Sequence, residues 1–270
     1  MNPFRQLLKR AGNQPPLGTW LLSASPLLAE AAGHAGFDWG VIDMEHGPLD
    51  MGDVVHLLQA VAGTRLVPVV RVPWNDTVAI KRVLDAGATT LLVPFVQDAD
   101  EAAAAVAATR YPPQGVRGMA GMSRAAHFGL KPDYLATANR GMAVIVQIET
   151  ESALAQLEAI GGTEGVDAVF IGPADLSGSM GIAGQVTHPR VMAAMRDAAR
   201  RCHAIGKPIG TIGVEPEVVA QYRAAGYDFL AVNSDLGLFV QASVAAMQAL
   251  RAKASDHVHD LTGGTHTRPA

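Results

Sequence analysis

Apolar residues in this chain fall in short continuous runs that alternate with longer segments of helical periodicity. Most of the short runs are apolar throughout, which is typical of strands buried on both faces of a parallel sheet. They span residues 17–22, 39–43, 66–72, 90–94, 143–149, 168–171, 208–212 and 229–232. The helical segments, rich in alanine, span residues 51–62, 77–86, 98–110, 151–160, 189–205, 215–225 and 235–253.

This alternation, repeated about eight times, predicts an α/β fold of the (β/α)8 TIM-barrel type. An open doubly wound sheet is the competing layout, but it usually stops at about five or six strands and carries a glycine-rich first turn. No G-x-G-x-x-G follows the first apolar run. Three helical segments end in an Ala-Gly step before a strand, so Gly36, Gly87 and Gly226 are predicted to end helices with a positive φ.

Length and periodicity indicate one domain. A chain of 270 residues is of the size of a single barrel. We expect the barrel to span residues 1–253 and residues 254–270, which lack periodicity, to be disordered. The longest interruption, residues 111–140, is rich in proline and glycine and ends in a predicted short helix over residues 133–139. Loops of this length are usually functional.

Composition excludes several classes of protein. Hydrophobic residues make up 49% and charged residues 17%, which favours a large core, and the net charge is -4. The sequence has no run of Lys and Arg, so it does not predict a basic surface that would bind nucleic acid or an anionic membrane. No signal peptide or membrane span is expected, and Cys202, the single cysteine, cannot form an internal disulfide. These features favour a cytoplasmic enzyme.

Polar side chains gather where the predicted strands end, which is the end of a barrel that carries the chemistry. They are Asp43, Glu45, His46, Arg71, Gln147, Glu149 and Asp175. Glu149 and Asp175 are hard oxygen donors on neighbouring strands and suit Mg²⁺ or Mn²⁺. The alternative is that both residues cap the helices that follow.

Three further residues have a chemical and a structural interpretation. Arg71 ends an apolar strand, where it either binds a substrate oxyanion or forms an ion pair with Asp43 or Glu45. His46 lies in a Gly/Pro turn, where an exposed imidazole suits proton transfer. Asp85 either orients His46 or simply ends a helix.

The lysines argue against Schiff-base chemistry, which needs a lysine on a strand inside the barrel. Three lie in helical segments, one lies in the long interruption and one precedes a strand: Lys9, Lys81, Lys253, Lys131 and Lys207. If the protein forms an enolate from a carbonyl substrate, the enolate would then have to be stabilised by a metal ion.

With these residues in place, the chain resembles the class II pyruvate aldolases of the 4-hydroxy-2-oxoheptane-1,7-dioate (2-keto-3-deoxy sugar acid) aldolase and citrate lyase family. The resemblance runs over about residues 3–250 and rests on the motifs DMEHGP, RVPWND, RYPPQGVRG, QIET and FIGPADLSGSMG in this order. Asn233 stands where relatives often have glycine. The resemblance implies a barrel of the phosphoenolpyruvate/pyruvate-binding type.

The resemblance also implies roles for single residues. Glu149 and Asp175 would bind Mg²⁺, Mn²⁺ or Co²⁺, and His46, oriented by Asp85, would be the acid/base. Arg71 would stabilise the enolate oxygen. The remaining substrate-binding residues would be Gln147 in the pocket and the backbone of Gly172, Ala174 and Asp175 around the pyruvate carboxylate. A homohexamer, a trimer of dimers with a swapped last helix, is implied as well.

The expected reaction is reversible cleavage of a 4-hydroxy-2-oxo acid to pyruvate and an aldehyde. The alternatives are a CoA-thioester lyase or an oxaloacetate decarboxylase on the same barrel, and a non-catalytic barrel that binds an oxo acid. A CoA user should need a basic patch for the phosphates, and the loops carry scattered arginines instead. The sequence does not name the aldehyde or the metal.

Overall fold

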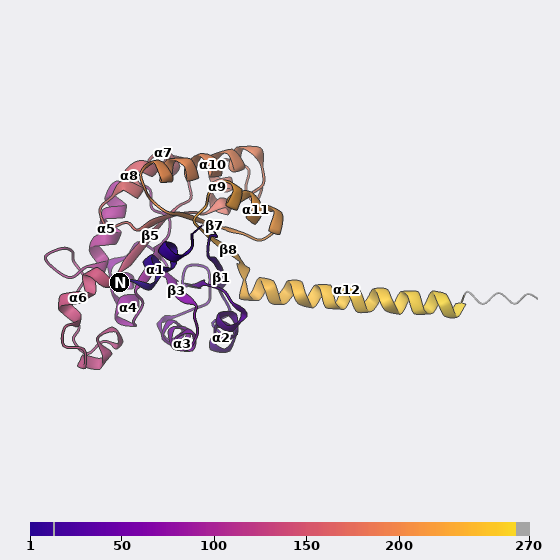
Figure 1. Cartoon of the computed structure of the whole chain (residues 1–270), viewed down its shortest axis with the longest axis horizontal. Coiled ribbons are helices and arrows are strands. Elements are labelled where there is room, and N and C mark those ends of the chain that lie inside the picture. The colour runs from indigo at the N-terminus through magenta and orange to yellow at the C-terminus, as the bar shows by residue number, and fades with distance from the viewer. Residues whose placement is uncertain (13, 263–270) are drawn as a thin grey trace, which may run out of the picture. The chain divides into compact units, whose positions relative to one another are not determined.

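Eight parallel strands close into a barrel in the computed structural model, which describes residues 1–12 and 14–262. Each strand pairs with its neighbours along the chain, and β1 pairs with β8. The strands are β1 (Leu17–Leu21), β2 (Trp39–Asp43), β3 (Val67–Arg71), β4 (Thr90–Val93), β5 (Ala143–Ile148), β6 (Ala168–Ile171), β7 (Ile209–Gly213) and β8 (Phe229–Ser234). The predicted (β/α)8 barrel is confirmed (Figure 1).

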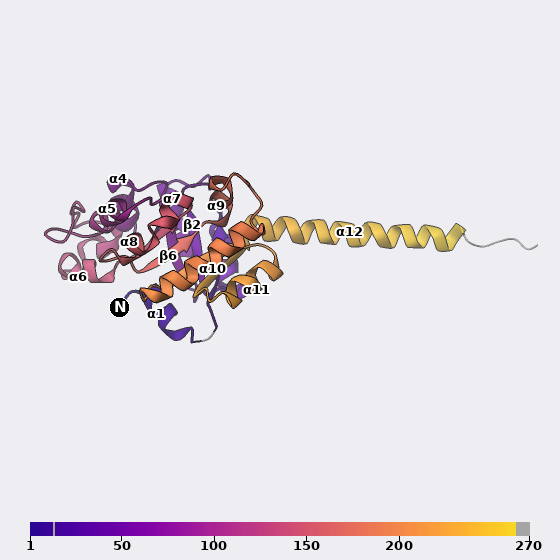
Figure 2. The same cartoon turned by 90° about the horizontal axis from the view of Figure 1, so that it is seen from above.

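The helices that connect consecutive strands lie around the outside of the barrel, as the two perpendicular views show (Figures 1 and 2). The helices of the described residues are α1 (Pro3–Arg10), α2 (Pro26–Ala35), α3 (Met51–Val61), α4 (Thr77–Asp85), α5 (Ala99–Thr109), the 3₁₀ helix η1 (Arg124–Gly129), α6 (Tyr134–Gly141), α7 (Glu151–Ala155), α8 (Leu157–Gly162), α9 (Pro173–Ser179), α10 (Pro189–Ala204), α11 (Pro216–Ala224) and α12 (Asp235–Thr262). Residues 151–160, expected as one helix, form α7 and α8, which meet at Gln156. The helical ranges predicted from the sequence did not include α1, α2 or α9.

Two hydrophobic cores hold the barrel together. Mainly aliphatic side chains fill the layer between strands and helices, and a second cluster, of aromatic and aliphatic side chains, fills the interior of the barrel. Phe4 of α1 joins this inner cluster, with its ring 6.3 Å from that of Trp39 and 5.2 Å from that of Phe229. Because Trp39 and Phe229 are the first residues of β2 and β8, α1 closes the N-terminal end of the barrel and leaves the C-terminal end for the site.

Glycine ends the three helices for which it was predicted. Gly36, Gly87 and Gly226 have φ values of 103°, 107° and 91°. This left-handed conformation costs a residue without Cβ little and lets the chain turn directly into the next strand.

The chain divides into two compact units, Met1–Asp235 and Leu236–Ala270. The helix α12 extends to Thr262, past residue 253, where the barrel domain was predicted to end. The disorder predicted for residues 254–270 stays a prediction, and residues 263–270 lie outside the described part. Within the described residues, no helix combines the length and apolarity that a bilayer crossing requires.

Candidate active site

The polar residues identified from sequence lie at the C-terminal ends of two pairs of neighbouring strands. Asp43 and Arg71 are the last residues of β2 and β3 and lie opposite each other in register. Glu149 follows β5 directly, and Asp175 lies in the first turn of α9, just after β6. Parallel strands that close into a barrel must end on one rim, so these side chains face a common mouth.

Arg71 is the buried cation of this rim. Its Nε donates to Asp43 Oδ1 at 2.8 Å and its Nη2 to Asp43 Oδ2 at 2.6 Å, while Nη1 lies 2.8 Å from Glu45 Oε2. The guanidinium also lies over the Trp20 ring, 5.4 Å from its centre. Both ion pairs considered from sequence are therefore present. They leave one N–H on each Nη atom for another acceptor.

Glu149 is a buried carboxylate held by two donors. Only 3% of Glu149 is exposed to solvent. The Phe95 backbone N–H donates to Oε2 at 3.1 Å, and the Gln147 side-chain amide donates to Oε1 at a short distance. Both oxygens are fixed in position, so the carboxylate is preorganised rather than mobile.

The charge on Glu149 is poorly compensated. Burial, followed by the nearby charges of Asp175 and Glu45, raises the pKa of Glu149 to about 7, against a partial opposing effect of Arg71. Burial likewise raises the pKa of Glu45, although the Arg71 charge opposes it. Carboxylates crowded in this way are stabilised in their ionised form by a cation.

The donor set fits a divalent metal ion with an incomplete protein coordination shell. Glu149 and Asp175 supply carboxylate oxygens, and the buried Oε1 of Gln147 has no hydrogen-bond partner in the structure. No group of three or more His, Cys, Asp or Glu side chains among the described residues could hold a metal. Mg²⁺ and similar ions are commonly bound by one or two carboxylates and complete their shell with water and substrate oxygens.

Gly172 keeps the space beside Glu149 open. A Cβ atom at this position would lie 2.4 Å from Glu149 Oε1. Gly172 is the N-cap of α9, whose first-turn amides at Ala174 and Asp175 have no acceptor within the helix. The substrate-binding backbone expected from sequence therefore lies next to the carboxylate pair.

His46 and Asp85 do not meet within one chain. The His46 side chain is 66% exposed, and its Nε2 lies 4.0 Å from Glu45 Oε2. Asp85 ends α4, which returns the chain to the N-terminal end of the barrel before β4, and its carboxylate is 2.7 Å from Arg117 Nη2. Within a single chain the structure does not bring Asp85 to His46, because the helix places the two at opposite ends of the barrel, and the role predicted for Asp85 stays a prediction.

Sequence reasoning missed Phe95, which follows β4. Its backbone has a φ of 55°, unusual for a residue with a side chain. In this conformation the Phe95 backbone N–H donates its hydrogen bond to Glu149. The Phe95 ring stacks on the half-exposed Trp74, with the ring centres 5.8 Å apart. No residue type in the motif around Phe95 signals a left-handed backbone, so the sequence offered no way to find it.

Two other positions gain an explanation. Asn233, expected to differ from a family glycine, has a φ of 58°. Asn tolerates this region better than other residues with a side chain, so the substitution keeps the backbone conformation. Burial raises the pKa of the Cys202 thiol to about 12, which agrees with its interpretation as a packing residue.

Residues 17–242 match the model of the family described as HpcH/HpaI aldolase/citrate lyase. The chain is 48% identical to a 2-dehydro-3,6-dideoxy-6-sulfogluconate aldolase of Pseudomonas putida, over 92% of this chain and 96% of that protein. It is 44% identical to a 5-keto-4-deoxy-D-glucarate aldolase of Salmonella arizonae, over 88% and 92%. A family protein from Burkholderia cenocepacia with a crystal structure superposes with a TM-score of 0.89 at 44% identity, over 93% of this chain and all of that one.

The raised pKa of Glu149 predicts how pH affects the stability of the metal-free protein. The pKa of Glu149 rises from 4.5 to about 7 on folding, so its protonated carboxyl contributes to the free energy of unfolding. This contribution is fully present below about pH 4.5 and is lost as the pH rises through about 7. In denaturant unfolding with chelator, the free energy of unfolding of Glu149→Gln should exceed that of the wild type by about 3 kcal/mol at pH 8. The difference should be much smaller at pH 5.

Glu151→Gln, a matched change at an exposed side chain two residues further along, should follow the wild type at both pH values. If Glu149→Gln also follows the wild type throughout, Glu149 is not the group whose ionisation destabilises the fold.

The Asp85–Arg117 pair predicts a loss of stability that is independent of the active site. The Arg117 side chain is fully buried, so Asp85→Ala leaves a charge without its partner and should lower the free energy of unfolding by about 3 kcal/mol. Glu151→Ala, which breaks an exposed pair with Arg190, should cost less than about 1 kcal/mol. Equal unfolding midpoints for the two variants would contradict a structural role for Asp85.

Proposed function

The chain belongs to the HpcH/HpaI aldolase/citrate lyase family and is a carbon–carbon lyase of the aldolase type, and from this premise we propose a metal-dependent cleavage of 2-keto-3-deoxy sugar acids to pyruvate and an aldehyde. The observation that carries the metal requirement is the buried Glu149 carboxylate, which lies near Asp175 and Glu45. The sugar-acid substrate is proposed from the names of the two relatives.

Glu149 and Asp175 would hold the metal, and Mg²⁺, Mn²⁺ and Co²⁺ all suit oxygen donors of this kind. A divalent cation, when bound, supplies a Lewis acid that polarises the substrate carbonyl and stabilises negative charge on its oxygen. Gln147 and the Phe95 N–H keep Glu149 oriented, and Gly172 leaves room for the substrate beside it.

The other residues would bind substrate and move protons. The amides of Ala174 and Asp175 would receive the pyruvyl carboxylate, as first-turn amides bind anions well. Arg71, with an N–H left on each Nη, would donate to the C2 oxygen. In cleavage His46 would accept the proton of the C4 hydroxyl as the C3–C4 bond breaks, the aldehyde carbonyl forms and the bonding electron pair passes to the pyruvyl unit, whose C3 then takes up a proton.

A chelation series with matched variants tests this proposal. Pyruvate release from 5-keto-4-deoxy-D-glucarate and from 2-dehydro-3,6-dideoxy-6-sulfogluconate should stop after metal removal and return with Mg²⁺ or Mn²⁺. Glu149→Gln should lower kcat/KM by about a thousandfold, because several kcal/mol of charge stabilisation are lost. Glu151→Gln should stay within about twofold, since this side chain is exposed on the following helix.

Unchanged pyruvate release after complete metal removal would refute the metal requirement. If His46→Ala exchanges deuterium at C3 of pyruvate at the wild-type rate, with the wild-type dependence of that rate on pH, the proposed role of His46 is refuted. The relative kcat/KM values of the two substrates decide between a carboxylated and a sulfonated aldehyde.

We also propose that the chain forms a homo-oligomer through α12, the swapped-helix hexamer being the arrangement that the family resemblance implies. Taken by itself, α12 carries a stripe of exposed apolar side chains at helical spacing: Leu236, Phe239, Val240, Val244, Met247 and Leu250. Residues 236–250 contain no charged side chain, and an apolar stripe of this kind usually marks a protein–protein contact.

Light scattering after size-exclusion chromatography tests the role of α12. The combined variant Phe239→Asp, Val244→Asp should elute as a smaller species than the wild type, because it buries charges in the contact. Gln248→Asp introduces a charge into the same helix at a polar position and should keep the wild-type mass. A wild-type mass for the combined variant would exclude α12 from the assembly contact.

A further inference from the structure

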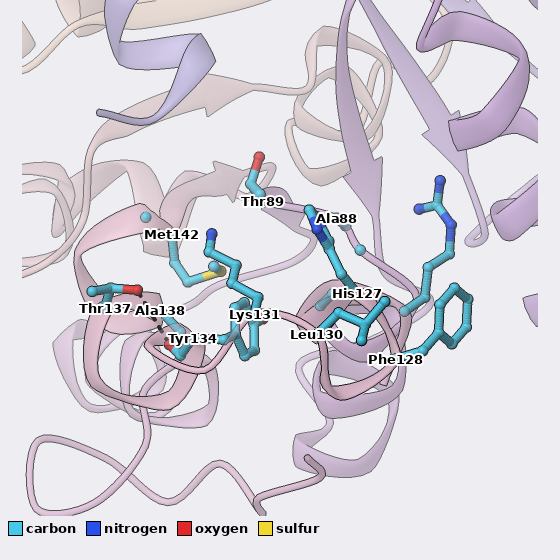
Figure 3. Close-up of a pocket in the computed structure, with 14 residues that line it drawn as sticks. Ala88, Thr89, His127, Phe128, Leu130, Lys131, Tyr134, Thr137, Ala138 and Met142 are labelled. Atoms are coloured by element: carbon cyan, nitrogen blue, oxygen red, sulfur yellow. Dashed lines mark hydrogen bonds between the residues drawn. The ribbon is translucent and has the colours of Figure 1, made fainter. Parts of the chain in front are cut away.

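A cavity of ≈ 530 Å³ lies at the end of the barrel opposite the candidate active site. Its walls are η1 and α6, and its floor includes Ala88 and Thr89, just before β4, and Met142, just before β5 (Figure 3). Because the strands begin here, the cavity is separated from the rim of Glu149 by the length of the barrel. Its volume is in the range of small-molecule sites.

Every formally charged side chain that lines this cavity is basic. The lining holds Arg124 and Lys131 with His127, and no Asp or Glu among its residues. Figure 3 shows His127 and Lys131 extending to the same side of the cavity. The lining is otherwise mostly apolar, with Ala138 and Met142 buried in its wall. The site thus combines cationic donors with an apolar surface.

Arg124 is anchored by a backbone contact, Lys131 is exposed beside an aromatic ring, and both retain free donors. Arg124 Nη1 donates to the Ala86 carbonyl at 2.8 Å, which anchors the guanidinium while its other N–H groups stay available. Lys131 Nζ lies 5.8 Å from the centre of the Tyr134 ring, a cation–π contact. No salt bridge joins either cation to an acidic side chain of the described residues.

Backbone strain supports an interpretation as a binding site. His127 and Phe128 both adopt left-handed conformations, with φ of 51° and 55°, and are followed by Gly129 at 87°. Residues held in such conformations cost free energy and cluster at ligand sites. Hydrogen bonds from Phe128 N to Ser123 O and from Lys131 N to Ala126 O maintain the turn.

Charge is also distributed unevenly in sequence. The whole chain has a net charge of -4, yet residues 110–140 contain five Arg or Lys and one Asp. The segment that builds the cavity is therefore locally positive in an acidic protein, which favours anions at this place.

We propose that this cavity binds a small organic anion, with an oxyanion group on Arg124 and Lys131 and a compact apolar body against Ala138 and Met142. The oxyanion is a carboxylate or a phosphate, both of which suit arginine and lysine donors. This second site is independent of the metal chemistry proposed for the opposite end.

Titration calorimetry on the full chain tests the site with three probes at fixed ionic strength. Benzoate carries a carboxylate on an apolar ring, benzyl alcohol is its neutral counterpart, and inorganic phosphate is the anion alone. Benzoate should bind saturably and benzyl alcohol should not. Lys131→Gln and Arg124→Gln should each weaken benzoate by about tenfold, the usual effect of one lost charged hydrogen bond.

Arg140→Gln is the matched control, because Arg140 lies on α6 with the same charge but does not line this cavity. It should bind benzoate as the wild type does. Tighter binding of phosphate than of benzoate, with the same loss in Lys131→Gln, would assign a phosphate as the oxyanion.

Three results would overturn the proposal. The first is that neither benzoate nor phosphate binds saturably. The second is that benzoate binds equally well to the wild type, Arg124→Gln and Lys131→Gln. The third is that Arg140→Gln weakens benzoate binding as much as Arg124→Gln and Lys131→Gln do. Because Arg124 also anchors Ala86, Arg124→Gln could impair folding, and the exposed Lys131 then decides the outcome, checked by an unchanged thermal unfolding midpoint.

Discussion

The crowding of buried carboxylates at one end of a closed barrel is the constraint on which the rest of the site depends. Asp43, Glu45 and Glu149 come from strand ends that the closure of the sheet brings to one rim. Arg71 forms direct ion pairs with the first two and offsets one of their two negative charges. Glu149 receives neutral donors instead, so its ionised form depends on a further cation. The same imbalance that destabilises the metal-free rim is the basis on which we propose a metal site there.

The two ends of the barrel carry opposite chemistry. The C-terminal end gathers acids around one arginine, whereas the N-terminal end is closed by Phe4 of α1 and flanked by a basic segment over residues 110–140. Helices that run back along the outside of the barrel bring their C-terminal residues to this second end. Asp85 is therefore available to the buried Arg117 rather than to His46, and its carboxylate stabilises the long interruption after α5.

Rigid packing explains how the acidic rim holds its geometry. Interior aromatic side chains fill the barrel up to Trp20, over which the Arg71 guanidinium lies. Above this layer Gly172 and the strained Phe95 bring backbone close to the Glu149 carboxylate. The proposed metal site, built on strand ends and supported from below in this way, would need little rearrangement to bind an ion.

The sequence by itself determined the barrel and the composition of its reactive rim. Continuous apolar runs, alternating with amphipathic helices, allow few other arrangements, and residues directly after a strand must reach the C-terminal end, as Glu149 and Arg71 do. Only the tertiary structure decided the partners of Arg71, the separation of Asp85 from His46, the left-handed backbone of Phe95 and the basic cavity beside η1. Such features depend on contacts between segments far apart in the chain and on local backbone torsions, and neither periodicity nor residue type encodes them.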